Sequence, residues 1–298
     1  MYDIIIIGAG PAGLTAAIYA KRAAKKVLVL EGNTYGGQII NTLDIENYPA
    51  EEHISGFDFA TKLYEQALHL GAEIKFERVL EITKAKEVKT KDNVYKAKSI
   101  IIAVGSKNKQ LGLINEDDFV GKGISYCATC DGAFYKDKNV AIVGGGNTAI
   151  EDALYLSNIV NKVYVIHRRE EFRADQSGLD KLEKKDNVEF LLNCNVTKLI
   201  GKERLEKIEV TDNDKNTAEI VIDGLFIAIG RTPETEIFSN LNIDKNGYII
   251  AGEDCKANEP GIFVAGDVRQ KTLRQLVTAT NDGAIAATNA ISYLNGGN

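Results

Sequence analysis

Two cysteines three positions apart, Cys127 and Cys130, are the residues of this chain best suited to chemistry. A pair with this spacing can close a small disulfide and open it again, so it can store two electrons that a neighbouring group delivers. Asp131 follows directly and could supply the proton that a released thiolate needs. The sequence therefore predicts a redox centre at 127–132, served by whatever the flanking segments bind.

A glycine-rich segment near the N-terminus has the pattern of a dinucleotide site. It lies between an apolar strand expected at 4–7 and a helix expected at 14–24, and its residues are Gly8, Gly10, Pro11, Ala12 and Gly13. Glycines there allow a tight turn close to a pyrophosphate, and the amides of the helix N-terminus favour that anion. Glu31 ends the next expected strand, 27–30, and suits a ribose 2′-hydroxyl.

A second glycine-rich segment repeats the first at an offset of 136, so that Gly8 matches Gly144 and Gly10 matches Gly146. Asn147 and Thr148 then open another expected helix, and a strand expected at 162–166 follows. Val163 and Val165 of this strand match Val27 and Val29. Two similar dinucleotide-binding modules are therefore expected in one chain.

The two modules differ where they would meet the ribose. Glu31 of the first aligns with His167 of the second, which is followed by Arg168, Arg169 and, further on, Arg173. A carboxylate suits a free 2′-hydroxyl, as in FAD, whereas arginines bind a 2′-phosphate with their planar forks. The second module is therefore expected to take NADPH rather than NADH, although a solvated basic loop is the alternative reading of the arginines.

Several other segments add to this outline. Turns are expected at Gly37-Gln38 and around Asn47, an amphipathic helix at 57–70 and β-hairpin strands at 73–99. The strand expected at 261–265 ends in Gly266-Asp267, where a carboxylate could meet a ligand hydroxyl. A helix rich in small residues is expected over 272–294, and its N-terminus could stabilise negative charge.

Length and composition narrow the class of protein. The 298 residues suit two domains, and the net charge of −6 gives no basic field for nucleic acid. No apolar run reaches the ~18 residues of a membrane helix, and no signal peptide is visible, so a soluble cytoplasmic protein is expected. Cys194 and Cys255 form no second close pair, so neither a zinc site nor any other metal site is expected.

The ordered motifs GAGPAG, GGQ, ENYP, CATCDG, GGGNTAIE, HRREEFRA, AIGRTP, GDVRQKTLRQ and DGAIAA span essentially the whole chain. In this order they closely resemble the low-molecular-weight thioredoxin reductases of bacteria. The resemblance implies an α/β fold of two Rossmann-like, three-layer ββα domains, with the second inserted in the first. We expect the FAD domain at 1–112 and 246–298, and the NADPH domain with the cysteine pair at 113–245. The resemblance also implies oxidised thioredoxin as the protein substrate, and a homodimer.

The same resemblance implies roles for individual residues. FAD would lie along 8–13 with Glu31 at its ribose, and the residues at its flavin end would be Gly37, Gln38, Asn47, Gly266, Asp267, Arg274, Gln275 and Leu276. NADPH would lie along 144–149, with His167 as a further contact and with Arg168, Arg169 and Arg173 around its 2′-phosphate. Cys130 would meet the flavin, Cys127 would attack the thioredoxin disulfide, and Asp131 would manage the thiolate proton. Chain crossings near 106–126 and 231–247 would serve as hinges between the domains.

Three other functions remain as alternatives, and a single feature distinguishes each of them from an NADPH-dependent thioredoxin reductase. A thioredoxin reductase that takes electrons from ferredoxin would keep the flavin and the dithiol but lack Arg168, Arg169 and Arg173. A ferredoxin–NADP reductase of the same fold would lack the cysteine pair. A redox-sensing flavoprotein, which acts by binding a partner in one oxidation state, would bind flavin with little turnover.

Overall fold

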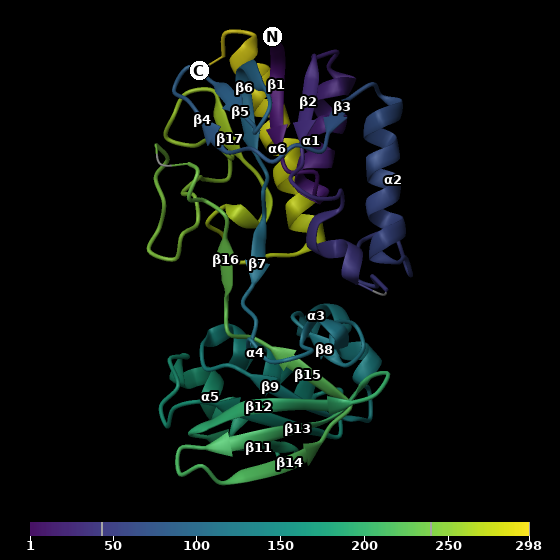
Figure 1. Ribbon diagram of the computed structural model, residues 1–298, viewed down its shortest axis with the longest axis vertical. Coiled ribbons are helices and arrows are strands. Elements are labelled where there is room, and N and C mark those ends of the chain that lie inside the picture. Colours follow the sequence, from purple (N-terminus) through teal and green to yellow (C-terminus); the bar gives the residue numbers. More distant parts are fainter. Residues whose placement is uncertain (43, 239, 298) are drawn as a thin grey trace. The chain divides into compact units, whose positions relative to one another are not determined.

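The computed structural model describes residues 1–42, 44–238 and 240–297, and the chain forms two compact units (Figure 1). The first unit is Met1–Lys107 with Thr232–Asn298, and the second, Asn108–Arg231, is inserted in it. Residue 239, within the expected hinge 231–247, and residue 298, the expected end of the first domain, lie outside the described residues.

The boundaries of the units fall before the expected ones, at 107/108 rather than 112/113 and at 231/232 rather than 245/246. The reason is packing, because Phe238, Leu241 and Ile249 already belong to a hydrophobic core of the first unit. At the two crossings the chain is extended, and strands β7 (Ser106–Asn108) and β16 (Arg231–Pro233) pair with each other.

The first unit is built on a sheet with a parallel centre. Strand β1 (Tyr2–Ile7) lies between β2 (Val27–Leu30) and β6 (Val94–Ile102) and runs parallel to both. The other strands are β3 (Glu73–Lys75) beside β2, β17 (Ile262–Val264) beside β6, and the antiparallel edge of β5 (Glu87–Lys89) and β4 (Glu81–Ile82). Because alternate residues of β1 enter opposite cores, both faces are buried, which explains the continuous apolar run.

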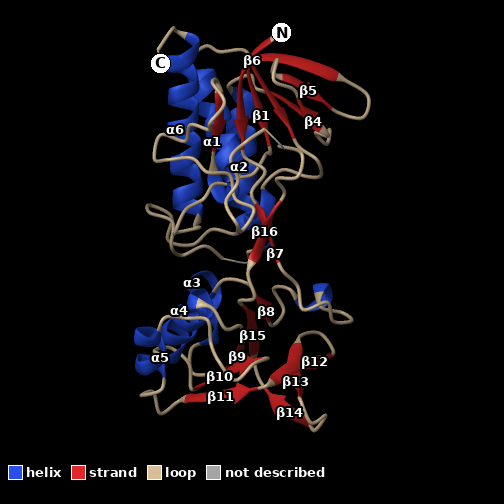
Figure 2. Cartoon of the chain, turned by 90° about the vertical axis from the view of Figure 1, so that its left-hand side faces the viewer, coloured by secondary structure: helices blue, strands red, loops and turns tan. Residues whose placement is uncertain are grey.

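Helices α1 (Pro11–Arg22), α2 (Gly56–His69) and α6 (Leu276–Leu294) belong to the first unit, and α1 and α6 lie against one face of its sheet (Figure 2). A Cβ at Gly283 of α6 would lie 2.2 Å from the carbonyl oxygen of Ala12, so a small residue is needed at this helix crossing. The last helix begins at Leu276 rather than at 272, because Gln275 is still extended and its N–H bonds the Thr278 hydroxyl at 3.1 Å.

The second unit has three layers. Its parallel sheet has the order β11 (Val188–Leu192), β10 (Lys162–His167), β9 (Asn139–Val143), β15 (Gly224–Ile227) and β8 (Ile124–Ser125). One face of it is covered by helices α4 (Asn147–Ser157) and α5 (Gln176–Leu182). The other face packs on the antiparallel sheet β12 (Cys194–Gly201), β13 (Leu205–Asp212) and β14 (Thr217–Val221). The expected three-layer α/β architecture is thereby confirmed.

Short helical turns complete both units: η1 (Gly37–Asn41) and η4 (Gly266–Val268) in the first, and η2 (Asp117–Phe119), α3 (Ala128–Asp131) and η3 (Gly132–Tyr135) in the second. In each unit a glycine-rich turn joins the carboxyl end of a central parallel strand to a helix, which is the edge where open α/β sheets bind ligands. Within the described residues, no helix has the length and apolar character needed to cross a membrane.

Candidate active site

The first glycine-rich turn has no room for side chains. Gly8 has φ +106°, and a Cβ there would lie 2.3 Å from the carbonyl oxygen of Ala103. A Cβ at Gly13 would lie 1.9 Å from the carbonyl oxygen of Gly8. Helix α1 begins directly after Gly10 with Pro11 in its first turn, and no side chain caps it. Its N-terminal amides therefore remain available to an anion such as a pyrophosphate.

Glu31 is tied to this turn through both carboxylate oxygens. The N–H of Ala9 donates to Oε2 at 2.8 Å, and the N–H of Asn33 donates to Oε1 at 2.9 Å. Gly36 donates its N–H to the carbonyl oxygen of Ala9 at 2.8 Å, and a Cβ on Gly37 would lie 3.4 Å from Cα of Gly10. The structure thus brings Glu31 and the start of η1, with Gln38, to the same turn.

The C-terminal segment reaches the same place. A Cβ on Gly266 would lie 2.9 Å from the side chain of Ala12, so η4 with Asp267 packs on the first turn of α1. The guanidinium of Arg274 lies 4.0 Å from the ring centroid of Tyr248, and its Nε donates to the carbonyl oxygen of Asp267 at 3.5 Å. The expected FAD residues at both ends of the chain therefore meet in one unit.

Asn47 and Gln275 form a second junction within the first unit. Asn47 Nδ2 donates to Gln275 Oε1 at 3.3 Å, just before the buried Leu276 begins α6. No sequence pattern pairs these two residues, because 228 positions separate them. The loop that carries Asn47 is thereby joined to the N-terminus of α6.

A buried charged cluster, which no sequence motif indicates, lies behind η4. Asp282 is 1% exposed and binds Arg269 at 2.9 and 3.2 Å and Lys271 at 2.8 Å. Its Oδ2 also accepts the N–H of Gly266 at 3.0 Å. Although burial opposes ionisation, the bonds from Arg269 and Lys271 leave the pKa of Asp282 below its usual range. The cluster fixes the turn that carries Asp267 against α6.

The second glycine-rich turn also has no room for side chains, and here the imidazole ring of His167 fills part of the space. A Cβ on Gly145 would lie 2.0 Å from the ring of His167, and one on Gly144 would lie 2.5 Å from the carbonyl oxygen of Ala228. His167 is 5% exposed, stacks on Phe172 and places Nε2 3.2 Å from the carbonyl oxygen of Glu171. Burial, and then the neighbouring arginines, lower the pKa of His167. The ring therefore packs as a neutral group beneath the turn.

The basic loop after β10 folds back onto this turn, because the N–H of Arg173 donates to the carbonyl oxygen of Gly145 at 2.7 Å. Arg168, Arg169 and Arg173 are all exposed, and none of their side chains forms an ion pair within residues 1–42, 44–238 and 240–297. Exposed guanidinium groups beside a helix N-terminus suit a phosphate.

Two expected nucleotide residues begin helix α4. The side chain of Asn147 exchanges hydrogen bonds with Asp175, at 2.7 Å to its N–H and 2.9 Å to its carboxylate. Asn147 therefore also fixes the end of the basic loop, whereas Thr148 is exposed in the first turn of the helix.

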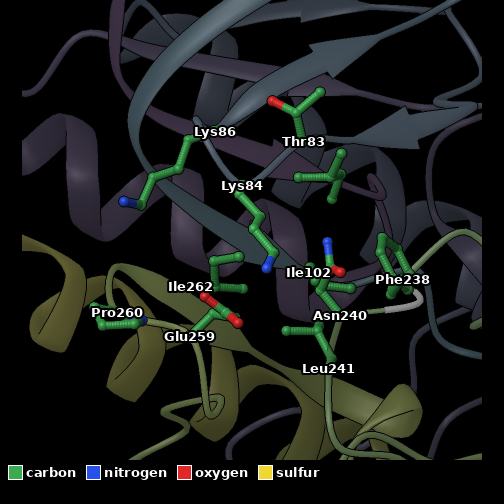
Figure 3. Close-up of a pocket in the computed structure, with 11 residues that line it drawn as sticks. Thr83, Lys84, Lys86, Ile102, Phe238, Asn240, Leu241, Glu259, Pro260 and Ile262 are labelled. Atoms are coloured by element: carbon green, nitrogen blue, oxygen red, sulfur yellow. The ribbon is translucent and has the colours of Figure 1, made fainter.

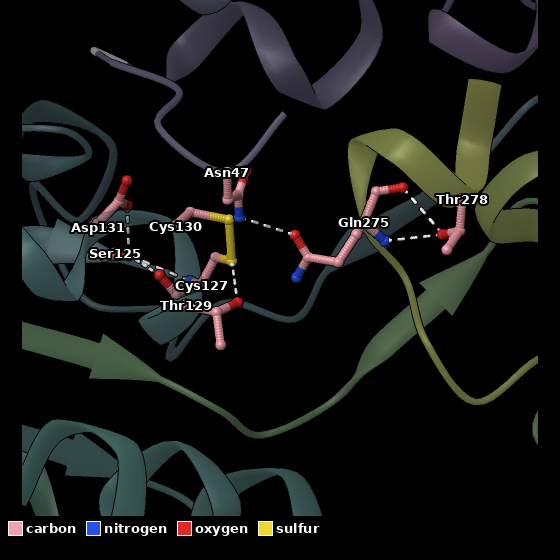
Figure 4. Close-up of a disulfide and its surroundings, with 8 residues drawn as sticks. All are labelled: Asn47, Ser125, Cys127, Thr129, Cys130, Asp131, Gln275 and Thr278. Atoms are coloured by element: carbon pink, nitrogen blue, oxygen red, sulfur yellow. Dashed lines mark hydrogen bonds between the residues drawn. A yellow bond between two sulfur atoms is a disulfide. The ribbon is translucent and has the colours of Figure 1, made fainter. Parts of the chain in front are cut away.

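The expected cysteine pair is a disulfide on a short helix of the second unit (Figure 4). Cys127 precedes α3, Cys130 lies within it, and their Cα atoms are 5.3 Å apart. Both cysteines are partly exposed, which leaves them open to exchange with another thiol. Cys194 and Cys255 are outside the pair, and burial raises the pKa of the Cys255 thiol to about 12.

Asp131 ends the same helix and is held by Ser125, the last residue of β8. Ser125 Oγ lies 2.6 Å from Asp131 Oδ2 and accepts the N–H of Cys127 at 3.1 Å (Figure 4). Burial raises the pKa of Asp131, and the bond from Ser125 opposes this shift. Ser125 stands two positions before Cys127, but a serine there carries no sequence signal of its role.

Glu116 fixes the approach to the disulfide. It is 3% exposed, and its carboxylate accepts the N–H groups of Leu111, Gly112 and Leu113 at 3.0, 2.8 and 3.3 Å. It also accepts the hydroxyl of Tyr126 at 3.0 Å, one residue before Cys127. No sequence pattern singles out Glu116, because only the folded loop places three amides around it.

A separate pocket of the first unit lies between Lys84, Glu259 and a group of apolar side chains that includes Ile102 and Phe238 (Figure 3). Its volume of about 30 Å³ is close to that of one water molecule. No residue expected at either nucleotide site lines it. The pocket is therefore too small for a dinucleotide and plays no part in the sites above.

Fold and site together define a two-domain dinucleotide-binding protein with a redox-type cysteine pair. The family described as pyridine nucleotide-disulphide oxidoreductase matches residues 2–283, and the chain belongs to this family.

Among individual relatives, the thioredoxin reductases of Listeria monocytogenes and Bacillus subtilis are each 43% identical to it. These matches cover 99% of this chain and 94% and 95% of the relatives. The crystal structure of thioredoxin reductase from Streptococcus pyogenes has a TM-score of 0.94 at 40% identity, and 99% of each chain is covered. The resemblance to bacterial thioredoxin reductases is confirmed over nearly the whole chain.

Proposed function

We propose that this protein is an NADPH-dependent thioredoxin reductase that passes electrons through FAD and the Cys127–Cys130 disulfide to oxidised thioredoxin. The observation that carries the proposal is the composition of the second unit. It holds the disulfide, the adjacent Asp131 and a glycine-rich turn flanked by three exposed arginines. A nucleotide donor and a disulfide acceptor are the two ends of such an electron relay.

The residues present fit both cofactors. The glycine turn at 8–13, the uncapped N-terminus of α1 and Glu31 would hold the pyrophosphate and ribose of FAD. Gly37, Gln38, Asn47, Gly266, Asp267, Arg274, Gln275 and Leu276 would hold its flavin end. Gly144, Gly146, Asn147 and Thr148 would hold the pyrophosphate of NADPH, with Arg168, Arg169 and Arg173 at its 2′-phosphate. The buried ring of His167 would support the glycine turn from beneath. When bound, the two cofactors supply hydride and two-electron chemistry.

The chain's own residues would then perform the disulfide exchange. Cys130 would take the electrons, and Cys127 would attack the thioredoxin disulfide as a thiolate. Asp131 would deliver a proton to a released thiolate, since burial raises its pKa and so favours its protonated form. Ser125 and Glu116 would keep the helix and the strand before it in place during these steps.

The test is NADPH oxidation with oxidised thioredoxin for the wild type, Cys130→Ser and the control Cys194→Ser, with NADH in parallel. We expect turnover with NADPH, weak turnover with NADH, loss in Cys130→Ser and full activity in Cys194→Ser. Flavin bleaching without thioredoxin reduction would contradict the acceptor. Failure of NADPH to bleach the flavin would contradict the donor and favour ferredoxin.

Two further features belong to the same proposal. We expect the protein to be a homodimer and to work in the cytoplasm, where thiol exchange with thioredoxin proceeds in a reducing medium. Sedimentation of the FAD-loaded protein at micromolar concentration tests the homodimer. Fractionation of cells that produce the protein tests its cytoplasmic location.

A further inference from the structure

Ser125 holds the redox helix at two points. It is 4% exposed at the end of β8, and its Oγ lies 2.6 Å from Asp131 Oδ2 and 3.1 Å from the N–H of Cys127 (Figure 4). A third oxygen, the carbonyl of Cys127, lies 3.3 Å from the same Oγ. One hydroxyl therefore faces the carboxyl group and both peptide groups of Cys127.

A serine hydroxyl has one hydrogen to donate and two lone pairs that accept. It can therefore donate to only one of its two oxygen neighbours at a time. When Asp131 is ionised, its carboxylate can only accept, so the bond between the two side chains uses the serine hydrogen. When Asp131 carries a proton, its O–H can donate to Ser125, and the serine hydrogen can turn to the carbonyl oxygen of Cys127. The N–H of Cys127 can bond Oγ in both states. Ser125 thus keeps a hydrogen bond to Asp131 and one from the N–H of Cys127 in either protonation state, while its bond to the Cys127 carbonyl forms only when Asp131 is protonated.

We propose that Ser125 is a positioning residue that holds Asp131 against the redox helix in both of its protonation states. The inference rests on the proposed function and adds a residue to it. Opening the Cys127–Cys130 bond takes up two electrons, which the reduced flavin supplies, and gives two thiolates. Asp131 transfers its proton to one thiolate and becomes ionised, while the second proton comes from solvent. The hydroxyl of Ser125 then turns from the Cys127 carbonyl to the carboxylate.

The other groups around Asp131 do not replace this bond. Tyr135 on η3 is a phenol whose pKa is raised to about 12 by burial, then by Asp131 and Asp223, so it stays neutral in ordinary assays. Helix α4 packs beside α3 and carries Tyr155 and Asp152, but within the described residues the side-chain hydrogen bond of Asp131 goes to Ser125.

Removing the hydroxyl should therefore make Asp131 harder to ionise. The test is an infrared pH titration of the protonated-carboxyl band in the oxidised, FAD-loaded full chain, with the band assigned by its loss in Asp131→Asn. We expect Ser125→Ala to move the midpoint upward by about one pH unit, since a hydrogen bond to a charged group is lost. The pH profile of thioredoxin turnover should move equally, and Ser125→Thr should restore both.

Ser157→Ala is the matched control, because it removes another buried hydroxyl of the same unit, one that bonds the carbonyl oxygen of Leu154 at 2.8 Å. It should move neither midpoint. If Ser125→Ala does not fold, Ser125→Gly removes the same hydroxyl. A variant that loses stability while its midpoint stays at the wild-type value, or falls, overturns the inference. A shifted midpoint in a protein that does not reduce thioredoxin supports the bond and contradicts only the proposed function.

Discussion

The backbone N–H of Arg173 lies 2.7 Å from the carbonyl oxygen of Gly145, and this bond closes the basic loop onto the glycine-rich turn of the same unit. A main-chain bond at this point does not depend on which side chain Arg173 carries. It positions the loop, so that Arg168 and Arg169 at the end of β10 are held near the N-terminus of α4.

Replacing Arg168 by alanine should weaken the use of NADPH without slowing chemistry. The loss of one guanidinium–phosphate contact is expected to raise KM for NADPH about tenfold or more while kcat changes little, because the contact lies far from the reacting atoms. KM for NADH should stay constant. Arg204→Ala, which removes an exposed arginine from the turn between β12 and β13, is the control. Equal losses with both nucleotides would refute the assignment of the 2′-phosphate site.

Glu31→Ala should reduce FAD affinity. The change removes the acceptor of the Ala9 and Asn33 amides and a candidate ribose ligand. We expect the Kd for FAD to rise at least tenfold, about the value of one charged hydrogen bond. Flavin content after gel filtration, or fluorescence titration of the apoprotein, measures this. Glu65→Ala, on the exposed side of α2, should keep its flavin, and unchanged affinity in Glu31→Ala would argue against a nucleotide at this turn.

Asp282→Asn should destabilise the first unit. Arg269 and Lys271 would lose the carboxylate that compensates their buried charges, and breaking such a cluster costs about 3 kcal/mol or more. Urea unfolding followed by flavin release measures the loss, with exposed Glu65→Gln on α2 as the control. Since the folded pKa of Asp282 is lowered, the stabilisation is present at neutral pH and is lost as the pH falls through that pKa. A urea midpoint of Asp282→Asn equal to that of the wild type would show that the cluster adds no stability.

Asp152 on α4 should make stability fall with rising pH. Burial, and then Glu151, raise its pKa from the usual 3.8 to about 6, while Arg231 opposes the shift. Between these values the folded protein keeps a proton that the unfolded chain releases, so the free energy of unfolding decreases as the pH rises. Asp152→Asn should match the wild type near pH 4 and be more stable at pH 7 by up to about 2 kcal/mol. Urea unfolding midpoints of both proteins at pH 4 and pH 7 test this prediction. An Asp152→Asn variant that is less stable than the wild type at pH 7 would refute it.

The sequence alone predicted those features that depend on local spacing. Gly8 and Gly13 must be glycine because any Cβ would meet backbone atoms, and this requirement is written directly in the pattern. The period of the apolar residues likewise predicted α2 to within one residue at each end. The cysteine spacing predicted the disulfide, because Cys127 and Cys130 are close in any short helix.

Only the tertiary structure decided the contacts between distant segments. Asp282 meets Gly266 and Arg269 because α6 folds back across α1, and Asn47 meets Gln275 across 228 positions. The boundary at 231/232 was likewise set by packing, since residues just after Pro233 bury apolar side chains in the first unit. The role of Ser125 depends on a strand end that places its hydroxyl between Asp131 and Cys127. Such hydrogen bonds follow from the positions of whole elements in space, and the order of residues along the chain does not contain them.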